Sequence, residues 1–351
     1  MSSDAPIIVG WGAVSPIGLT AAQTGLFLRA TRNWVRETPF IDGWGERVSA
    51  SRVAVLSPAV VGPERLARLA CAAFVQALSS MNREAGGLRV GVLLALAERY
   101  ANSGGTVQSP AGAVGEFVGH FRRGLPSSWA GVHVEWSASG HAGAAAALDR
   151  ATRWVMGGGV DVVVVGGVDS YYEWTALEAL GRQDRLLSPE NLDGLLPGEA
   201  AAFVVLAREN ALPGAQPIAR VAAVGTASEP VPLGSDEPCL AKGLTTALDR
   251  AVAPLRARRQ RSNYWLTDLT HETYRVKELQ IVIARFGDVV GTATTLLAPA
   301  REYGDVGAAS LPLLWVLALE AWYRGYAPDR SAVTIAGSDG GARGAVLLEA
   351  V

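Results

Sequence analysis

The chain has 351 residues, of which 49% are apolar and 18% are charged, and its net charge is only −2. This length and composition agree with a compact globular protein that buries a large core, and the near-neutral balance gives no general attraction for nucleic acid. No window approaches the roughly 18 uninterrupted apolar residues of a membrane span, so we expect none.

The first apolar run, near residue 7, is assigned to a strand, because the N-terminus ahead of it lacks the basic region of a targeting sequence. We therefore expect a cytoplasmic protein. An apolar helix is predicted over Leu66–Leu78, and Cys71 within it reads as an inert core thiol. Cys239 follows Pro238 at a helix start. Two cysteines are too few for a disulfide framework, and neither has the spacing of a metal site.

The centre of the chain is its most informative region. Residues 131–137 read as a strand that ends in a sharp turn at Ser137. The alanine-rich run Gly140 to Met156 predicts a helix packed on most of its surface. The β-branched run Val160 to Val165 predicts a strand buried on both faces, which we expect Gly166 and Gly167 to end.

A repeat of this pattern appears in the second half of the chain. The helix that begins at Gly143 and the strand that follows it are echoed by a helix from Gly307 and a strand over Ala332–Gly337. A short apolar strand follows each, at Ala201–Leu206 and at Gly344–Glu349. Such self-similarity indicates repeated supersecondary units. We expect an N-terminal half at 1–206 and a C-terminal half at 207–351, fused in one core.

Four segments resemble the β-ketoacyl synthases of the thiolase superfamily. The turn Glu135-Trp-Ser-Ala-Ser-Gly140 stands where the family has Thr-Ala-Cys-Ser-Ser-Gly at the start of a small-residue helix. The segments at 7–18, 193–206 and 337–344 resemble the family's opening strand, its Gly-Glu-Gly-Ala strand and its C-terminal glycine-rich turn. The resemblance covers nearly the whole chain and implies an α/β thiolase fold, a duplicated αβαβα layered sandwich.

The family's catalytic residues, by contrast, are not matched. Ser137 replaces the nucleophilic cysteine, and alignment on Gly307-Ala-Ala places Gly304 at the second histidine and Pro299 near the lysine. The His-Gly-Thr-x-Thr motif is replaced by a shorter segment in which Thr267 or His271 could hold the first histidine's position. A hydroxyl is a weak nucleophile without an adjacent base, whereas a cysteine is already partly ionised. A standard condensing enzyme is therefore not expected.

Two interpretations of Ser137 remain open. It could act at a strand-to-helix elbow, where helix amides favour negative charge, with His271 as its base and Asp268 or Glu272 orienting the imidazole. It could instead fill the space of a lost cysteine and cap the helix, which needs no catalysis. The second interpretation is favoured, because Trp136 beside the elbow could fill part of an acyl pocket.

Further residues are assigned to the pocket or to structure. The expected pocket-lining residues are Trp136, Ser139, His141, Gly304, Asp305 and Asp339. His141 follows the elbow by one helical turn and could face the pocket, although a surface or capped imidazole is the favoured interpretation. His133 should point away from the core, and Glu199 should pair with a backbone amide or an arginine. The scattered histidines predict no metal site, and no nucleotide or other cofactor motif is present.

The resemblance also suggests partners. A ketosynthase homologue without catalytic residues can pair with an active one, as chain-length factors do, so we expect a homodimer or a heterodimer with an active ketosynthase. The irregular stretch 103–129 resembles an insertion that builds such a contact. The basic run at 256–261 could dock an acidic acyl carrier protein. The leading hypothesis is a non-condensing partner or acyl-binding subunit in fatty-acid or polyketide-type metabolism. The alternatives are a serine acyltransferase or acyl-thioester hydrolase that uses Ser137, and a dimeric scaffold without a ligand.

Overall fold

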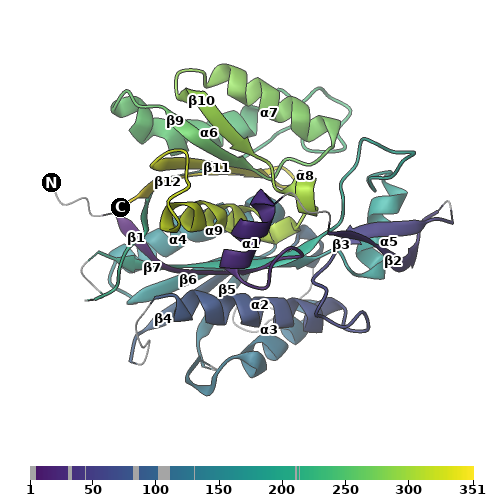
Figure 1. Ribbon diagram of the computed structural model, residues 1–351, viewed down its shortest axis with the longest axis horizontal. Coiled ribbons are helices and arrows are strands. Elements are labelled where there is room, and N and C mark those ends of the chain that lie inside the picture. Colours follow the sequence, from purple (N-terminus) through teal and green to yellow (C-terminus); the bar gives the residue numbers. More distant parts are fainter. Residues whose placement is uncertain are drawn as a thin grey trace.

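The computed structural model describes residues 5–30, 34–43, 45–81, 87–101, 111–129, 131–209, 212 and 214–351. It is a mixed α/β structure in which sheets and helices alternate in layers (Figure 1). Part of the irregular stretch, residues 103–110, lies outside the described residues. Within the described part of the chain, no helix is both long and apolar enough to cross a bilayer.

Ten strands form the main sheet in the order β10-β9-β11-β12-β8-β1-β7-β6-β4-β5. They are β1 (Pro6–Val14), β4 (Val90–Ala95), β5 (His133–Ser137), β6 (Val162–Ser170), β7 (Glu199–Arg208), β8 (Ala219–Ser228), β9 (Ser262–Thr267), β10 (Val290–Leu297), β11 (Ser331–Gly337) and β12 (Ala342–Ala350). A separate hairpin joins β2 (Val35–Ile41) to β3 (Arg47–Ser51).

The strand order is a duplication. Reading outward from the β8–β1 junction, β8, β12, β11, β9 and β10 mirror β1, β7, β6, β4 and β5, with antiparallel and parallel pairings in the same sequence. Among the described residues, the two sets of five strands are joined by two residue pairs between β1 and β8, Ile7 with Arg220 and Ile8 with Ala219. The predicted division after residue 206 falls just before the end of β7, and its position stays a prediction.

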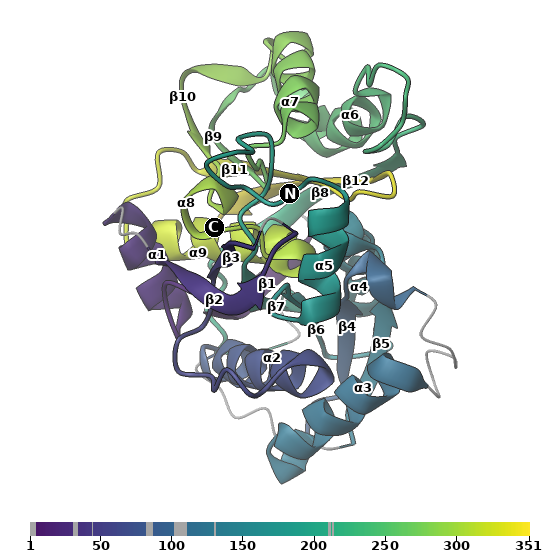
Figure 2. The same ribbon diagram turned by 90° about the vertical axis from the view of Figure 1, so that its right-hand side faces the viewer.

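Helices form three layers around the two sets of strands (Figure 1). The α-helices are α1 (Ala21–Arg29), α2 (Gly62–Ser79), α3 (Gly112–Gly124), α4 (Gly143–Met156), α5 (Trp174–Arg182), α6 (Lys242–Ala257), α7 (Thr273–Arg285), α8 (Ala300–Tyr303) and α9 (Ser310–Tyr323). Single 3-10 turns are η1 (Glu98–Tyr100), η2 (Ser127–Trp129), η3 (Gly140–Ala142) and η4 (Gly307–Ala309). Helices α4 and α9 lie between the two sets of strands, α2 and α3 cover the first set, and α6 and α7 cover the second (Figure 2).

The sequences of the central helices suit this middle layer. Helix α9 is apolar around nearly its whole circumference, and Ser310 through Ala321 are all buried. A helix that is hydrophobic all round belongs in a core. Helix α4 instead presents small side chains such as Ala144, Ala145 and Ala151, all fully buried, which allow close approach to the strands. The first turns of both helices follow a glycine with positive φ, Gly140 at 65° and Gly307 at 52°.

One predicted boundary is wrong. Gly166 and Gly167 do not end the β-branched strand, because β6 continues through them to Ser170. Their missing side chains are what lets it continue: a Cβ on Gly166 would lie 2.2 Å from Phe203, and one on Gly167 would lie 2.1 Å from the carbonyl oxygen of Ala308. These glycines therefore permit close packing inside the strand.

Candidate functional site

The elbow predicted at Ser137 exists. Ser137 is the last residue of β5, beside Ala95 of β4, and turn η3 and helix α4 follow it. A Cβ added to Gly143 would lie 3.8 Å from the Ser137 Oγ, so the half-buried hydroxyl lies against the start of α4. Within the described residues this hydroxyl makes no hydrogen bond to a base, a backbone amide or another side chain. Neither an activated nucleophile nor a helix cap is therefore seen at Ser137.

Turn η3, which leads into this helix, is bound by a serine from the other half of the chain. The Ser338 Oγ accepts a hydrogen bond from the backbone N–H of Ala142 (2.9 Å) and donates one to the carbonyl oxygen of Ser139 (2.6 Å). Ser338 is almost fully buried and belongs to the glycine-rich turn between β11 and β12. Ser338, and not Ser137, therefore holds the turn that leads into α4, and no spacing in the sequence marks it.

His141 is buried and ionically paired, so the favoured interpretation of a surface or capped imidazole is wrong. Its Nε2 lies 2.8 and 2.9 Å from the two carboxylate oxygens of Asp305, which precedes η4. The backbone N–H of Gly307 also donates to Asp305 (2.8 Å). Burial lowers the pKa of His141, but the charge and hydrogen bond of Asp305 outweigh it and raise this pKa to about 9. Burial raises the pKa of Asp305, yet His141 holds it below its usual value.

Two arginines continue the polar cluster. Arg185 donates to Glu272 (2.7 Å) and to Asp339 (2.8 Å), and Arg275 donates to Asp339 (2.7 Å) and contacts Asp268 at 3.4 Å. Burial raises the pKa of Asp339, but Arg275, His141 and Arg185 together hold it well below its usual range. Burial raises the pKa of Asp268 despite Arg275. The acidic and basic side chains of this cluster are therefore paired with one another.

A cavity of about 780 Å³ opens beside this cluster. Of the predicted pocket residues, His141 and Asp339 line it, whereas Trp136, Ser139, Gly304 and Asp305 are not among its walls. Ser137 does not line it either. Other wall residues are Glu98, Arg99, Gly140, Asp169, Tyr171 and Leu180. Arg99 donates to Asp169 (2.5 Å), which adds another matched pair. The cavity thus combines paired charges with a few apolar side chains.

His271 lies in different surroundings. It lines a separate cavity of about 430 Å³ with Leu28, Leu296 and Arg301, and Ser137 is not part of that cavity. Burial and the nearby Arg301 lower the pKa of His271, and its buried Nδ1 has no hydrogen-bond partner among the described residues. Both carboxylates proposed to orient it are engaged elsewhere, Asp268 with Arg275 and Glu272 with Arg185. A Ser137–His271 pair is therefore not assembled here.

Gly304 and Pro299, the residues aligned with the family's second histidine and lysine, have no side-chain hydrogen-bond donor. Gly304 has a φ of 93°, and a Cβ there would lie 2.9 Å from the carbonyl oxygen of Leu196. Pro299 stands immediately before α8. Thr267 ends β9 and is buried, four residues before His271 in its separate cavity. A side chain at residue 304 would require the backbone to move.

Glu199 and Trp136, which the sequence analysis also singled out, make contacts that stabilise the fold. Glu199 accepts hydrogen bonds from the Val53 amide (2.7 Å), from Ser170 (2.7 Å) and from both Nε and Nη2 of the fully buried Arg65. Its predicted pairing with an amide or an arginine is confirmed on both counts. Trp136 packs against the core of the first half, and its buried Nε1 has no partner among the described residues.

The cysteines are also accounted for. Burial raises the pKa of Cys71 to about 11, so its thiol stays protonated at neutral pH, as expected of an inert thiol. The Cys239 sulfur lies near Glu229 and Glu278 in a group with the spacing of metal ligands. Both carboxylates of that group already accept hydrogen bonds within the protein. Glu229 accepts one from the Gly243 amide (2.6 Å), and Glu278 accepts one from the guanidinium of Arg343 (2.8 Å).

Comparison with known proteins agrees with this fold. Residues 128–211 match the family model of the β-ketoacyl synthase N-terminal domain. No curated protein matches the sequence. Among solved structures, the ishigamide ketosynthase/chain length factor superposes with a TM-score of 0.72 at 20% identity, covering 99% of each chain. The type II AntDE:AntF complex of an acyl carrier protein with its ketosynthase superposes with a TM-score of 0.78 at 14% identity, again with 99% of each chain covered.

A third match is the ketosynthase ApeO in complex with its chain length factor ApeC from Xenorhabdus doucetiae, with a TM-score of 0.75, 15% identity, and coverage of 99% of this chain and 98% of that one. At these identities the structural likeness establishes the fold. The chain therefore has the fold of these ketosynthase structures, and residues 128–211 are similar in sequence to the β-ketoacyl synthase N-terminal domain.

Proposed function

We propose that this chain is a ketosynthase homologue without condensing activity that serves as a partner or acyl-binding subunit in fatty-acid or polyketide-type metabolism. Condensation needs a nucleophile that accepts the acyl chain and donors that stabilise the enolate formed on decarboxylation. In this chain Ser137 aligns with the nucleophile, and no base among the described residues is hydrogen-bonded to it.

The proposal rests mainly on the positions and contacts of the four histidines. His141 is held by Asp305, His271 lines another cavity, and His133 is exposed on β5 beside Glu135 (3.1 Å). His120 lies on α3, on the outside of the first half. The enolate donors of the family are therefore not reproduced. With a pKa near 9, His141 is protonated at neutral pH, so it cannot act as a general base for Ser137.

A partner role draws support from strand β5. Among the described residues β5 pairs only with β4, so one of its edges carries unpaired backbone groups. Arg150 and His133 both bind Glu135 beside this edge, at 2.7 and 3.1 Å. Two of the similar structures are titled as complexes of a ketosynthase, one with a chain length factor and one with an acyl carrier protein. Pairing with an active ketosynthase, or with a second copy, is the assembly that we propose.

The serine-enzyme alternative has less support. It needs His271 at Ser137, but the two residues lie in different surroundings and the carboxylates that would orient the imidazole bind arginines. The ligand-free scaffold predicts a pocket filled by Trp136 and its neighbours. Trp136 packs against the core of the first half and does not line the cavity of about 780 Å³ beside His141, so this alternative keeps its support.

The test is intact-protein mass spectrometry after incubation with acyl- and malonyl-carrier thioesters. We expect no covalent adduct on the wild-type chain, because the Ser137 hydroxyl lacks a base. Ser137→Cys is the matched positive control, since a thiol at the same position is partly ionised near neutral pH and can be acylated. A wild-type adduct that disappears in Ser137→Ala would contradict the proposal and establish a serine acyl-enzyme.

A further inference from the structure

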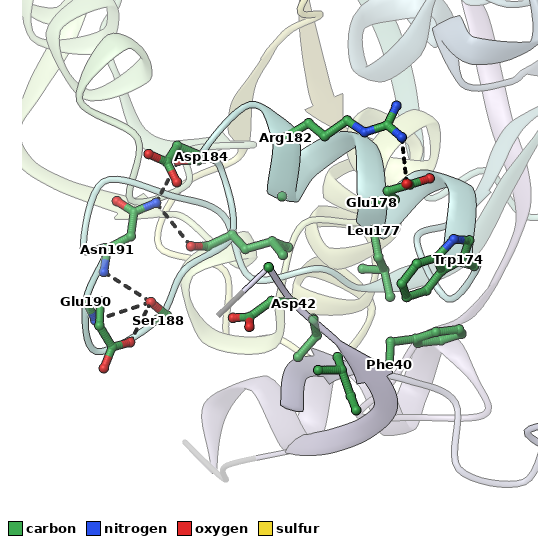
Figure 3. A pocket seen from close by; sticks show the side chains of 15 residues that line it. Phe40, Asp42, Trp174, Leu177, Glu178, Arg182, Asp184, Ser188, Glu190 and Asn191 are labelled. Atoms are coloured by element: carbon green, nitrogen blue, oxygen red, sulfur yellow. Dashed lines mark hydrogen bonds and ion pairs between the residues drawn. The ribbon is translucent and has the colours of Figure 1, made fainter. Parts of the chain in front are cut away.

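Helix α5 lines two cavities, a first cavity of about 780 Å³ beside His141 and a second of about 520 Å³ (Figure 3). In the second cavity, Arg182 donates a hydrogen bond to Glu178 (2.6 Å) and Ser188 donates one to Glu190 (3.1 Å), as Figure 3 shows. These polar side chains are therefore already paired. The first cavity differs, because two buried polar groups on its wall have no partner among the described residues.

The charged side chains that line the first cavity are bound within the protein. Arg99 donates to Asp169 (2.5 Å), and Arg185 donates to Asp339 (2.8 Å). Glu98 accepts a hydrogen bond from a backbone amide (3.0 Å). The polar atoms of a ligand in this cavity must therefore be bound by other groups of the wall.

Tyr171 and His141 supply such groups. Tyr171 is 8% exposed and lines the first cavity, and its hydroxyl makes no hydrogen bond among the described residues. The Nε2 of His141 lies between the two carboxylate oxygens of Asp305, but its Nδ1 has no partner in the described part of the chain. Because the pKa of His141 is about 9, Nδ1 carries a hydrogen at neutral pH. Both groups are therefore available donors on the wall of one cavity.

The surroundings of Tyr171 disfavour a negatively charged ligand. Burial is the largest cause that raises the pKa of Tyr171, and the negative charges of three carboxylates raise it further, those of Asp305, Asp169 and Asp339. Arg99 lowers this pKa, but by less than any one of the three carboxylates raises it. A further negative charge beside the hydroxyl is therefore unfavourable, whereas a neutral acceptor oxygen meets no such repulsion.

We propose, on the basis of the acyl-binding function above, that the first cavity binds a neutral acyl group without a covalent bond and rejects an acyl group that ends in a carboxylate. The Tyr171 hydroxyl and the His141 imidazole are the donors to its carbonyl oxygens. Ala176 and Leu180 of α5 are buried in the same wall and contact its hydrocarbon part. The volume lies within the range of small-molecule sites, about 300–1,000 Å³.

The test compares two thioesters of nearly the same shape, S-acetoacetyl-N-acetylcysteamine and S-malonyl-N-acetylcysteamine, by ligand-observed NMR titration of the full chain. The first compound ends in a methyl ketone and the second in a carboxylate. We expect the acetoacetyl compound to bind at least about fivefold more tightly. Asp339→Asn should narrow this difference, because it removes one of the carboxylates whose charge acts on Tyr171.

Two readouts test the donors. Tyr171→Phe removes only the hydroxyl and should weaken binding of the acetoacetyl compound about fivefold, the loss expected for one hydrogen bond. Tyr172→Phe is the matched control, because this neighbouring tyrosine is also buried but packs against Phe40 and does not line the cavity, so affinity should be unchanged. The Nδ1–H signal of His141 should shift when the acetoacetyl compound binds.

Equal affinities for the two compounds, or an unchanged affinity in Tyr171→Phe, would overturn the proposal. Failure of the proposed function is read separately. A covalent adduct on Ser137 or release of carbon dioxide would contradict that function, whereas titrations repeated in Ser137→Ala would still report which of the two compounds the cavity binds.

Discussion

Asp305 is a fully buried carboxylate whose charge is matched mainly by His141. In His141→Gln the carboxylate would stay buried without its counter-ion, and we expect a loss of about 3 kcal/mol in the free energy of unfolding. The double variant His141→Gln/Asp305→Asn should recover much of that loss, because no uncompensated charge remains. Chemical denaturation of the three proteins at pH 6.5 measures both effects.

The same pair predicts a pH dependence. The folded-state pKa of His141, about 9, lies above its unfolded value near 6.5. The stabilisation of the fold by the protonated His141 imidazole is therefore complete below about pH 6.5 and is lost as the pH rises toward 9. The melting temperature of the wild type should fall over this range more steeply than that of His141→Gln. Parallel profiles for the two proteins would contradict the assigned ion pair.

At the scale of residues, prediction succeeded where chemistry alone decides. A carboxylate at the start of a buried strand must have a partner, so the pairing of Glu199 was predictable, although Arg65 as the partner was not. The His141–Asp305 pair was missed because its members are 164 residues apart and the pairing depends on how η3 meets η4. Arg185 and Arg275 were missed for the same reason, since no local spacing marks them.

Helix α4 shows how an element is completed by a distant segment. Ser338 accepts a hydrogen bond from the Ala142 amide in turn η3, directly before α4, so Ser338→Ala should lower the free energy of unfolding by about 1 kcal/mol, the usual net value of one hydrogen bond. Ser137→Ala is the matched control, because the Ser137 hydroxyl makes no hydrogen bond within the described residues, and it should change stability by less than about 0.5 kcal/mol. Urea denaturation of both variants decides the point, and a larger loss at Ser137 would be contrary to the structure.

At the scale of elements, the helices and strands of the repeat were predictable from apolar and alanine-rich runs, since these runs are long. The end of β6 was not, because Gly166 and Gly167 were expected to break a strand. Their role depends on Phe203 and on the backbone at Ala308, which occupy the space where side chains would be. A glycine pair in a sequence does not distinguish a turn from close packing.

At the scale of the molecule, the duplication was visible in the sequence because both halves keep the same helix–strand–strand pattern. The strand order mirrors it about the β8–β1 junction. The charge network of the candidate site was not visible, because Arg185 belongs to the first half while Arg275 and Asp339 belong to the second. Ion pairs between residues of the two halves can be recognised only once the fold is known.

One edge of β5 has no strand partner among the described residues, and this predicts an assembly. Sedimentation of the purified chain, alone and co-expressed with an active ketosynthase, should give a complex of at least twice the chain mass of 36.7 kDa in one of the two preparations. Amide exchange should slow at residues 133–137 on assembly, while β10, at the opposite edge of the sheet, serves as the internal control. A monomer in both preparations, or protection at β10 alone, would argue against this interface.

The most direct test of lost condensing chemistry is release of labelled carbon dioxide from malonyl-carrier thioester, because decarboxylation requires enolate donors even where no acyl-enzyme forms. The wild-type chain should release it at the rate without protein, since Gly304 has no side chain and His141 is bound to Asp305. Release well above that rate that persists in Ser137→Ala and is lost in His141→Gln would contradict the account and make His141 a catalytic residue.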